Sequence, residues 1–566
     1  MRMKAILLGA TCAIALAPAA HAERGTDGEV KLTYPQAVSI MTPYLSAGTK
    51  DVIAASMVIE PLAGYDDKGN LIPRLVTEIP TLANGGISAD MTSITWKLIP
   101  GLLWSDGTPV TADDVIFTAN YCMDPAGGCA SLAKFDGIKS VEAVDASTVK
   151  VTFTAPKPNP YTAFVGNLAP ILQKAQFEPC IGAAAPTCTD QNTMPIGTGP
   201  FRVTAFTVND TVSMEANPNY RDPMKPAFAT AVIKGGGDAE GSARAVMETG
   251  EFDYAWNTQI PPDSQTAMTA AGKGQFVVAF GTSVERIEIN LTDPSADLPE
   301  GERSTVKHPH PILSDMKVRQ ALSMAIDRQI LSDVGYGAGG SPTCNVIPNP
   351  PAFVSGNTSC LTQDMAGAMA LLDEAGWVFG ADGIREKDGK KLSLVYQTTV
   401  NPIRQDFQAL IKDWWAELGV QTELKAIDPS VFFGGDAGSP DTYQKFYADV
   451  EMFTNNFDGT DPESFMAGYL CSKIPGPDSQ WQGDNINRYC DPAYDAKWAE
   501  LSAASDPAMR QEIAKALNDM VTKDSYTAIP LVHRGTLSAH SNTLGGVAIN
   551  AWDTEMWNVE NWYRIK

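Results

Sequence analysis

Histidine is scarce in this sequence, and the common motifs of hydrolytic enzymes are missing from it. Only five of the 566 residues are histidines. No segment has the GxSxG pattern of serine hydrolases, the HExxH pattern of zinc proteases or the GxxxxGK(S/T) pattern of nucleotide-binding loops. The sequence therefore gives no support for catalysis by a serine–histidine pair or a zinc ion. We expect a protein that is not an enzyme and that needs no cofactor.

Positive charge is also in short supply. The chain has 42 lysines and arginines against 66 aspartates and glutamates, which gives a net charge of −24. Because an acidic surface repels phosphate backbones, we do not expect a nucleic-acid partner. Hydrophobic residues make up 44% and charged residues 19% of the chain, which is typical of a folded globular protein.

The only long apolar run lies at the start of the chain. Arg2 and Lys4 precede or flank the apolar segment Ala5–Ala17, and small residues follow up to Ala22. These thirteen apolar residues fall short of the roughly 20 that a membrane-spanning helix needs. The pattern therefore predicts a cleaved signal peptide over residues 1–22 and a periplasmic location for the mature protein.

The cysteines agree with export. Cys12 lies in the predicted signal peptide, and the other eight cysteines fall into four pairs that are close in sequence, with no CxxC segment. Disulfides persist in oxidising compartments, whereas a structural zinc site needs closely spaced cysteines or histidines. We predict four disulfides: Cys122–Cys129, Cys180–Cys188, Cys344–Cys360 and Cys471–Cys490.

Helical and strand-like patterns alternate along the chain. Apolar residues recur on one helical face over residues 318–331 and 405–418, and Gly419 follows the second segment where a helix commonly ends. Residues 149–154 and 420–424 alternate as half-buried strands do. This mixture predicts an α/β fold. Glycine and proline are spread evenly, so we expect the chain to cross more than once between any two lobes.

Two polar clusters could carry chemistry. His308 and His310 lie in a proline-rich loop, but two histidines alone rarely hold a metal, so a solvated loop is the preferred interpretation. Asp458, Asp461 and Glu463 could bind calcium, supply the acid and base of a hydrolase, or present one carboxylate to a cationic ligand. Taken alone, this second segment is interpreted as an ordinary loop.

Four segments, in this order along the chain, change that interpretation. They are Gly101–Val115 (GLLWSDGTPVTADDV), Ile196–Phe201 (IGTGPF), Asn217–Arg221 (NPNYR) and Val318–Arg328 (VRQALSMAIDR). Together they resemble solute-binding protein family 5, the dipeptide- and oligopeptide-binding proteins of ABC importers.

The resemblance implies a particular architecture. It is an α/β periplasmic-binding-protein fold with two lobes, a hinge between them and an extra subdomain in the first lobe, and the ligand is enclosed between the lobes. Mapped onto this sequence, lobe I spans residues 23–285, with the inserted subdomain at about 76–195, and is completed by residues 535–566. Lobe II spans residues 286–534.

The resemblance also implies a ligand site. In peptide-binding members an aspartate four residues before a proline meets the amino terminus of the ligand, and Asp458, with Pro462, matches that position. Some members use an arginine just ahead of a second-lobe helix for the ligand carboxylate, because its fork can donate two bonds. Arg404 lies there, although a surface arginine at a helix start is an equal alternative. The other implied contacts are Gly48, Thr49, Trp256, Asn257, Asn456 and Phe457, of which Trp256 can equally be a core residue.

The implied function is that of a periplasmic substrate-binding protein of an ABC importer. Such a protein captures peptides or peptide-like solutes and, as a monomer, delivers them to the membrane permease subunits. Two alternatives stay open. One is a secreted hydrolase that uses Asp458 with a second carboxylate. The other is a binding protein for another solute, such as an opine, a sugar, nickel or haem, with His308 and His310 as candidate ligands for the last two.

Overall fold

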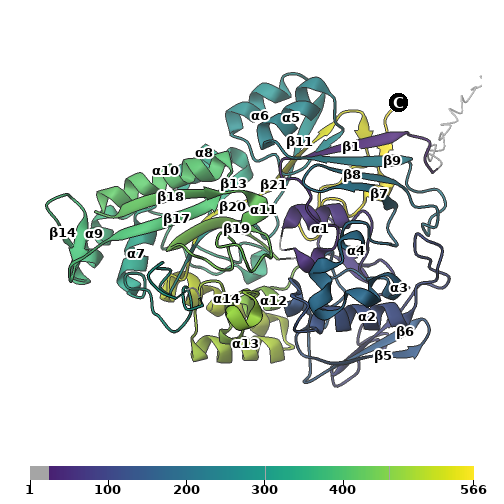
Figure 1. Cartoon of the computed structure of the whole chain (residues 1–566), viewed down its shortest axis with the longest axis horizontal. Helices are drawn as coiled ribbons and strands as arrows, with labels where there is room; N and C mark the ends of the chain where they lie inside the picture. Colours follow the sequence, from purple (N-terminus) through teal and green to yellow (C-terminus); the bar gives the residue numbers. More distant parts are fainter. Residues whose placement is uncertain (1–23, 47, 300, 458) are drawn as a thin grey trace, which may run out of the picture.

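Two large sheets, each with its own helices, form two lobes (Figure 1). The computed structural model describes residues 24–46, 48–299, 301–457 and 459–566. The predicted signal peptide and Asp458 therefore lie outside the described residues. Within the described residues, no helix is both long and apolar enough to cross a membrane.

The first lobe is built on a seven-stranded sheet. Its strands are, in spatial order, β11 (Gly274–Ala279), β21 (Thr536–Ser541), β10 (Tyr254–Ala255), β1 (Glu29–Tyr34), β9 (Thr230–Gly235), β8 (Thr211–Ala216) and β7 (Phe201–Thr207). β1 runs parallel to both β9 and β10. Val30, Leu32 and Tyr34 alternate with polar residues along β1 and are fully buried, which anchors this strand in the first-lobe core.

A smaller subdomain extends the first lobe. It contains the antiparallel sheet of β4 (Ser93–Lys97), β6 (Thr148–Phe153) and β5 (Ile138–Asp145), with α2 (Ala112–Met123), α3 (Lys174–Phe177) and α4 (Thr189–Thr193) beside it (Figure 1). The start of α2 is capped by its own residues. The Asp114 carboxylate accepts a hydrogen bond from the backbone N–H of Thr111 at 2.9 Å, which satisfies a donor ahead of the first turn.

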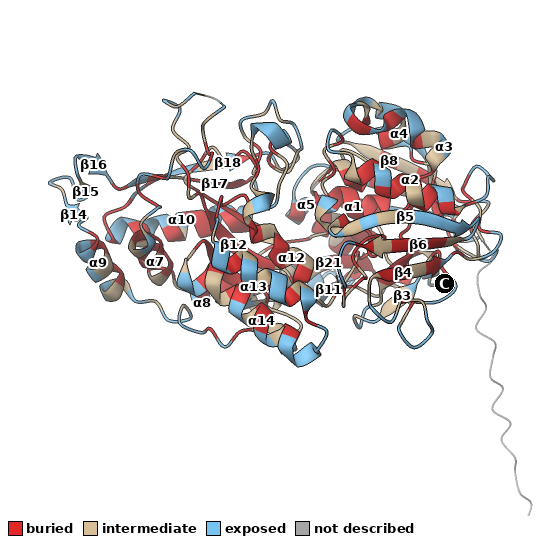
Figure 2. Cartoon of the chain, turned by 90° about the horizontal axis from the view of Figure 1, so that it is seen from below, coloured by how far each residue is buried: buried red, intermediate tan, exposed pale blue. Residues whose placement is uncertain are grey.

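The second lobe is built on a six-stranded sheet. Its strands are, in spatial order, β13 (Gly340–Pro342), β20 (Ala528–Arg534), β12 (Val284–Ile289), β19 (Val450–Asn455), β17 (Ser393–Thr399) and β18 (Gln421–Ile427). Helices α7 (Met316–Met324), α8 (Arg328–Gly335), α9 (Met365–Glu374) and α10 (Pro402–Glu417) share an apolar core with it. Helices α13 (Pro492–Ala503) and α14 (Pro507–Asp519) form a separate layer with exposed outer turns and buried inner turns (Figure 2).

One of the two predicted helices is continuous and the other is broken. Residues 405–417 fall in α10, as the periodicity predicts, and Leu418 is its C-cap. The expected single helix over residues 318–331 is wrong, because α7 ends at Met324 and α8 begins at Arg328. The Asp327 carboxylate accepts hydrogen bonds from the backbone N–H groups of Gln329 and Ile330, both at 3.0 Å, and so caps a new helix in the middle of an unbroken apolar stripe.

The chain passes between the two large sheets at two places. Residues 280–283 join β11 to β12, and Gly535 joins β20 to β21. All eight cysteines of the described residues form disulfides, each between the two cysteines that are close in sequence. Their Cα atoms are 4.6–5.8 Å apart.

Candidate ligand-binding site

A cavity of about 350 Å³ lies where the two lobes face each other. This volume is near the lower end of the range for small-molecule sites in proteins. The first lobe contributes α1 (Thr49–Ala55), the segment after β10 and the segment 550–555. The second lobe contributes β12, β19, the helical segment that starts with α12 (Glu463–Met466), and the loop around residues 484–487. The walls therefore come from segments that are hundreds of residues apart in sequence.

The expected first-lobe residues all line this cavity. Gly48 and Thr49 begin α1, and Trp256 and Asn257 follow β10. Trp256 also packs against Tyr34 with ring centroids 5.0 Å apart, and only 4% of its surface is exposed. It is thus both a core residue and a cavity wall, so the two interpretations of Trp256 are compatible.

Asn456 and Phe457 line the cavity from the second lobe. The hydroxyl of Thr282 accepts a hydrogen bond from the backbone N–H of Phe457 at 2.9 Å and donates one to its carbonyl oxygen at 2.7 Å. This reciprocal pair holds the end of β19 against the crossing segment 280–283. Asp458 follows directly and lies outside the described residues.

Arg404 lines the cavity, and its guanidinium already has an acidic partner in the protein. Asn401 caps α10 by accepting a hydrogen bond from the Arg404 backbone N–H at 3.1 Å. The Arg404 guanidinium donates to Glu285 at 2.8 Å and to the hydroxyls of Thr399 and Thr454 at 2.7 and 3.2 Å. Burial alone would raise the pKa of Glu285, but the charges of Arg404 and Arg534 outweigh it and lower that pKa. A ligand carboxylate at Arg404 would share this guanidinium with Glu285.

Several charged residues of the cavity wall were not predicted from the sequence. Arg286 and Glu288 on β12 form an ion pair, and Arg534, Glu555 and Asp484 also line the cavity. The residues of β12, VERIEI, contained the available signal, because they put charged side chains on both faces of a short strand that otherwise looks apolar and buried. Asp484 lies in a loop with no motif, so no signal in the sequence pointed to it.

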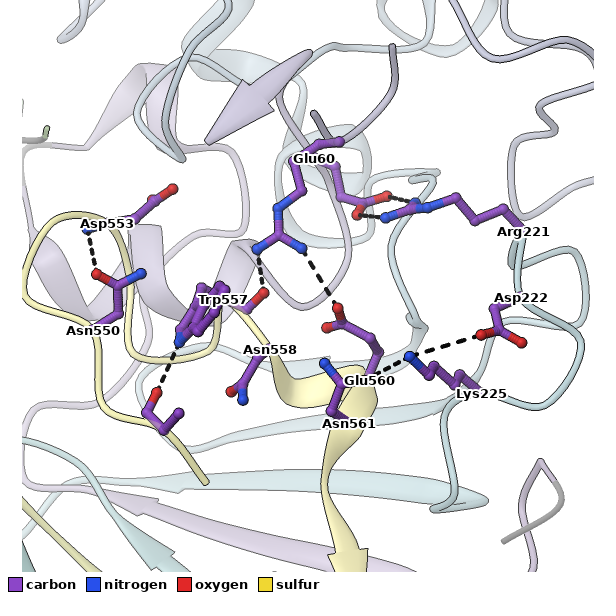
Figure 3. Close-up of polar contacts among 12 residues, drawn as sticks. Glu60, Arg221, Asp222, Lys225, Asn550, Asp553, Trp557, Asn558, Glu560 and Asn561 are labelled. Atoms are coloured by element: carbon purple, nitrogen blue, oxygen red, sulfur yellow. Dashed lines mark hydrogen bonds and ion pairs between the residues drawn. The ribbon is translucent and has the colours of Figure 1, made fainter. Parts of the chain in front are cut away.

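Hydrogen bonds and ion pairs connect the C-terminal segment to the rest of the first lobe (Figure 3). Arg74 donates to the carbonyl oxygen of Trp557 and lies 3.5 Å from the Glu560 carboxylate. Nearby, Glu60 and Arg221 form a two-bond ion pair at 2.7 and 2.8 Å. The segment held in this way begins with residues 550–555, which form one side of the cavity.

The carboxylates expected for a hydrolase are engaged elsewhere. Arg510 donates to Asp461 at 2.8 Å and to Glu463 at 2.7 Å, and neither carboxylate lines the cavity. His308 and His310 pair with Glu302 and Asp449, each at 2.8 Å. Among the described residues, no group of three or more histidine, cysteine, aspartate or glutamate side chains could hold a metal ion.

Comparison with known proteins identifies the family. Residues 70–476 match the bacterial extracellular solute-binding proteins, family 5. The chain belongs to this family. Family 5 proteins bind solutes for ABC transporters and are not enzymes, which argues against the hydrolase alternative.

Three family 5 relatives illustrate the range of similarity. An ABC transporter peptide-binding protein of Brucella ovis is 26% identical over 471 residues, which is 81% of this chain and 79% of that protein. The glutathione-binding protein GsiB of Shigella flexneri is 24% identical over 513 residues, covering 89% of each chain. The structure of the oligopeptide-binding protein AppA of Bacillus subtilis, solved with a nonapeptide, superimposes with a TM-score of 0.81, at 19% identity, over 96% of this chain and 100% of AppA. The last likeness shows the periplasmic-binding-protein fold.

Proposed function

We propose that this chain captures short peptides or peptide-like solutes between its two lobes and delivers them to the permease subunits of an ABC importer. The observation that carries this proposal is the cavity of about 350 Å³ lined by both lobes with side chains of both charges. A free peptide is a zwitterion, and its burial is favourable only where counter-charges and hydrogen bonds replace water. The names of the Brucella and Shigella relatives support a peptide or a tripeptide-like thiol as the solute class.

Within this function we propose specific roles for the expected residues. Asp458 takes the ligand's amino group, since Phe457 just before it lines the cavity. Arg404 offers hydrogen bonds to the ligand carboxylate while it stays paired with Glu285. Gly48, Thr49, Trp256, Asn257 and Asn456 complete the walls. The division into lobe I, lobe II and a C-terminal return is proposed with crossings at residues 280–283 and Gly535.

We further propose that the protein is exported, cleaved after Ala22 and monomeric in the periplasm. The N-terminal pattern of charges, apolar residues and small residues supports cleavage, and the four disulfides suit an oxidising compartment. N-terminal sequencing of the secreted protein is expected to begin at Glu23.

Native mass spectrometry of protein purified from the periplasm tests the ligand class. The expected result is a population of co-bound short peptides that denaturation releases, followed by calorimetric binding of synthetic dipeptides and tripeptides. Recovery of a sugar, an opine, nickel or haem in place of peptides would overturn the peptide assignment. Haem would also be visible by its absorbance.

A further inference from the structure

Asp484 presents to the cavity a carboxylate that no described residue binds. It lines the cavity, and by surface area it is exposed. Burial nevertheless raises the pKa of its carboxyl, with a lowering influence from Lys473 and a raising one from Asp136. Lys473, whose charge lowers that pKa, is itself paired with Asp136 of the first lobe at 2.6 Å.

The loop that carries Asp484 is held without help from its carboxylate. The Cys471–Cys490 disulfide closes this loop. Asn485 donates to the carbonyl oxygens of Leu470 and Tyr489 at 2.9 and 2.6 Å. Arg488 donates to carbonyl oxygens of the segments around residues 304 and 444, both at 2.8 Å. A carboxylate that its own fold does not use, fixed at a cavity wall, is available to a ligand.

Aromatic rings also line the cavity, in the cluster that contains Ile486, two residues after Asp484. Phe433, Tyr443 and Phe453 all line the cavity, with ring centroids 5.5–5.9 Å from one another. Burial is the main cause of the raised pKa of the Tyr443 hydroxyl, and the negative charge of Asp484 adds to it, so the two groups are electrostatic neighbours. Aromatic faces attract cations, and they do so most strongly when water is excluded.

The other acidic group that the second lobe contributes to the wall is already matched. Glu288 pairs with Arg286. Asp484 therefore places at the cavity wall a negative charge that no described side chain binds, and a partly desolvated charge of that kind is stabilised by a ligand of opposite sign.

We propose that Asp484, with the rings of Phe433 and Tyr443, forms a subsite for a cationic group of the ligand, either an ammonium or a guanidinium. This inference rests on the proposed function, and it narrows the ligand to solutes with a positive charge in addition to any α-amino group at Asp458. Basic peptides and amino-acid derivatives with a basic side chain have this chemistry.

Matched tripeptides test the subsite. Three alanine tripeptides carry one lysine at the first, second or third position, and each has a counterpart with norleucine, which keeps the length but removes the charge. Calorimetry is expected to show that the wild-type protein prefers lysine over norleucine at one position by about tenfold to a hundredfold. Asp484→Asn is expected to bring that preference within about threefold, and Asp484→Glu to retain much of it.

The control variant is Asp478→Asn, an exposed aspartate inside the same disulfide-closed loop. It is expected to keep the wild-type preference. Equal binding of lysine and norleucine peptides by the wild-type protein, or a preference that survives Asp484→Asn, would overturn the subsite and leave the proposed function intact. If the wild-type protein binds no tripeptide, the peptide assignment is wrong. The subsite is then tested by comparing the binding of arginine with that of citrulline, which has a similar shape but no positive charge. Equal binding of these two amino acids, or no binding of either, would overturn the subsite.

Discussion

Arg404 and Glu285 form an ion pair that is almost completely shielded from solvent, with 5% and 0% of their side chains exposed and 2.8 Å between Arg404 Nε and Glu285 Oε1. The pair joins the start of α10 to β12 at the edge of the cavity. A residue expected to serve the ligand is therefore also part of the framework of the second lobe.

The first prediction separates these two roles of Arg404. Arg404→Met leaves the buried Glu285 carboxylate with the more distant Arg534, 4.0 Å away, in place of its closest partner, so we expect the free energy of unfolding of ligand-free protein to fall by about 3 kcal/mol. Urea unfolding measures it. The double variant Arg404→Met with Glu285→Gln is expected to recover much of that loss, because neither charge is left alone. Arg244→Ala, which breaks only exposed pairs on α5 (Ala239–Arg244), is the control, with a loss within about 0.5 kcal/mol. Unchanged stability in Arg404→Met would show that the pair does not support the fold.

The second prediction concerns Asp458. Asp458→Ala is expected to weaken the binding of peptides with a free amino terminus by about 2–5 kcal/mol, because the ligand's ammonium loses its counter-charge. Peptides acetylated at the amino terminus lack that charge, so their already weaker binding is expected to change much less. Calorimetry with a peptide in both forms measures the difference. Equal losses for the two forms would contradict the role of Asp458.

The sequence predicts those features that depend on near neighbours. The periodicity of residues 405–418 defines α10, and the close spacing of cysteines indicates all four disulfides. The break at Asp327 escapes the same reasoning, because an apolar stripe continues through it while a single side chain caps a new helix. Where one helix ends and the next begins depends here on a few hydrogen bonds to backbone N–H groups and not on the spacing of apolar residues.

Contacts between segments that are distant in sequence could not be predicted from the sequence. Arg404 could be placed near the ligand by resemblance, but its partner Glu285 lies 119 residues earlier, on β12 in the interior of the second-lobe sheet. Asp484 gives no sign of its role, since a lone aspartate in a polar loop is ordinary. Its position in the cavity follows only from the packing of the disulfide-closed loop against the rest of the second lobe.

The third prediction concerns the contact between lobes at Gly459. Its backbone N–H donates to the carbonyl oxygen of Trp552 at 2.7 Å, its φ is +74°, and a Cβ atom there would lie 2.5 Å from the Tyr65 ring. Gly459→Ala therefore meets both backbone strain and a clash with the first lobe. We expect peptide affinity to fall by about tenfold or more, and small-angle X-ray scattering to show a larger radius of gyration with ligand present.

The matched control for Gly459 is Gly28→Ala. Gly28 has a similar φ of +72°, but nothing lies within 4 Å of the added carbon. This variant carries the backbone strain without the contact between lobes, so its stability is expected to fall while its peptide affinity stays close to that of the wild type. A loss of affinity as large as that of Gly459→Ala would assign the effect to strain alone.

The fourth prediction follows from a buried acid in the second-lobe sheet. Glu451 on β19 is fully buried, and its Oε1 atom has no hydrogen-bond partner among the described residues. Burial raises the pKa of its carboxyl well above the ordinary value; a hydrogen bond from Gln397 opposes this and the charge of Glu288 adds to it. The folded protein therefore holds a proton that the unfolded chain releases near pH 4.5.

The sign of the effect on stability follows from this proton. Above the unfolded pKa and below the folded one, the folded state binds more protons than the unfolded state, so stability falls as pH rises, by up to about 1.4 kcal/mol per pH unit for this one group. Glu451→Gln cannot ionise and still accepts the hydrogen bond from Gln397. Urea unfolding between pH 5 and 8 is expected to show a smaller decline with pH for this variant than for the wild type. Glu417→Gln, at the exposed end of α10, is expected to keep the wild-type slope. Parallel curves for Glu451→Gln and the wild type would mean that Glu451 is ionised in the folded protein.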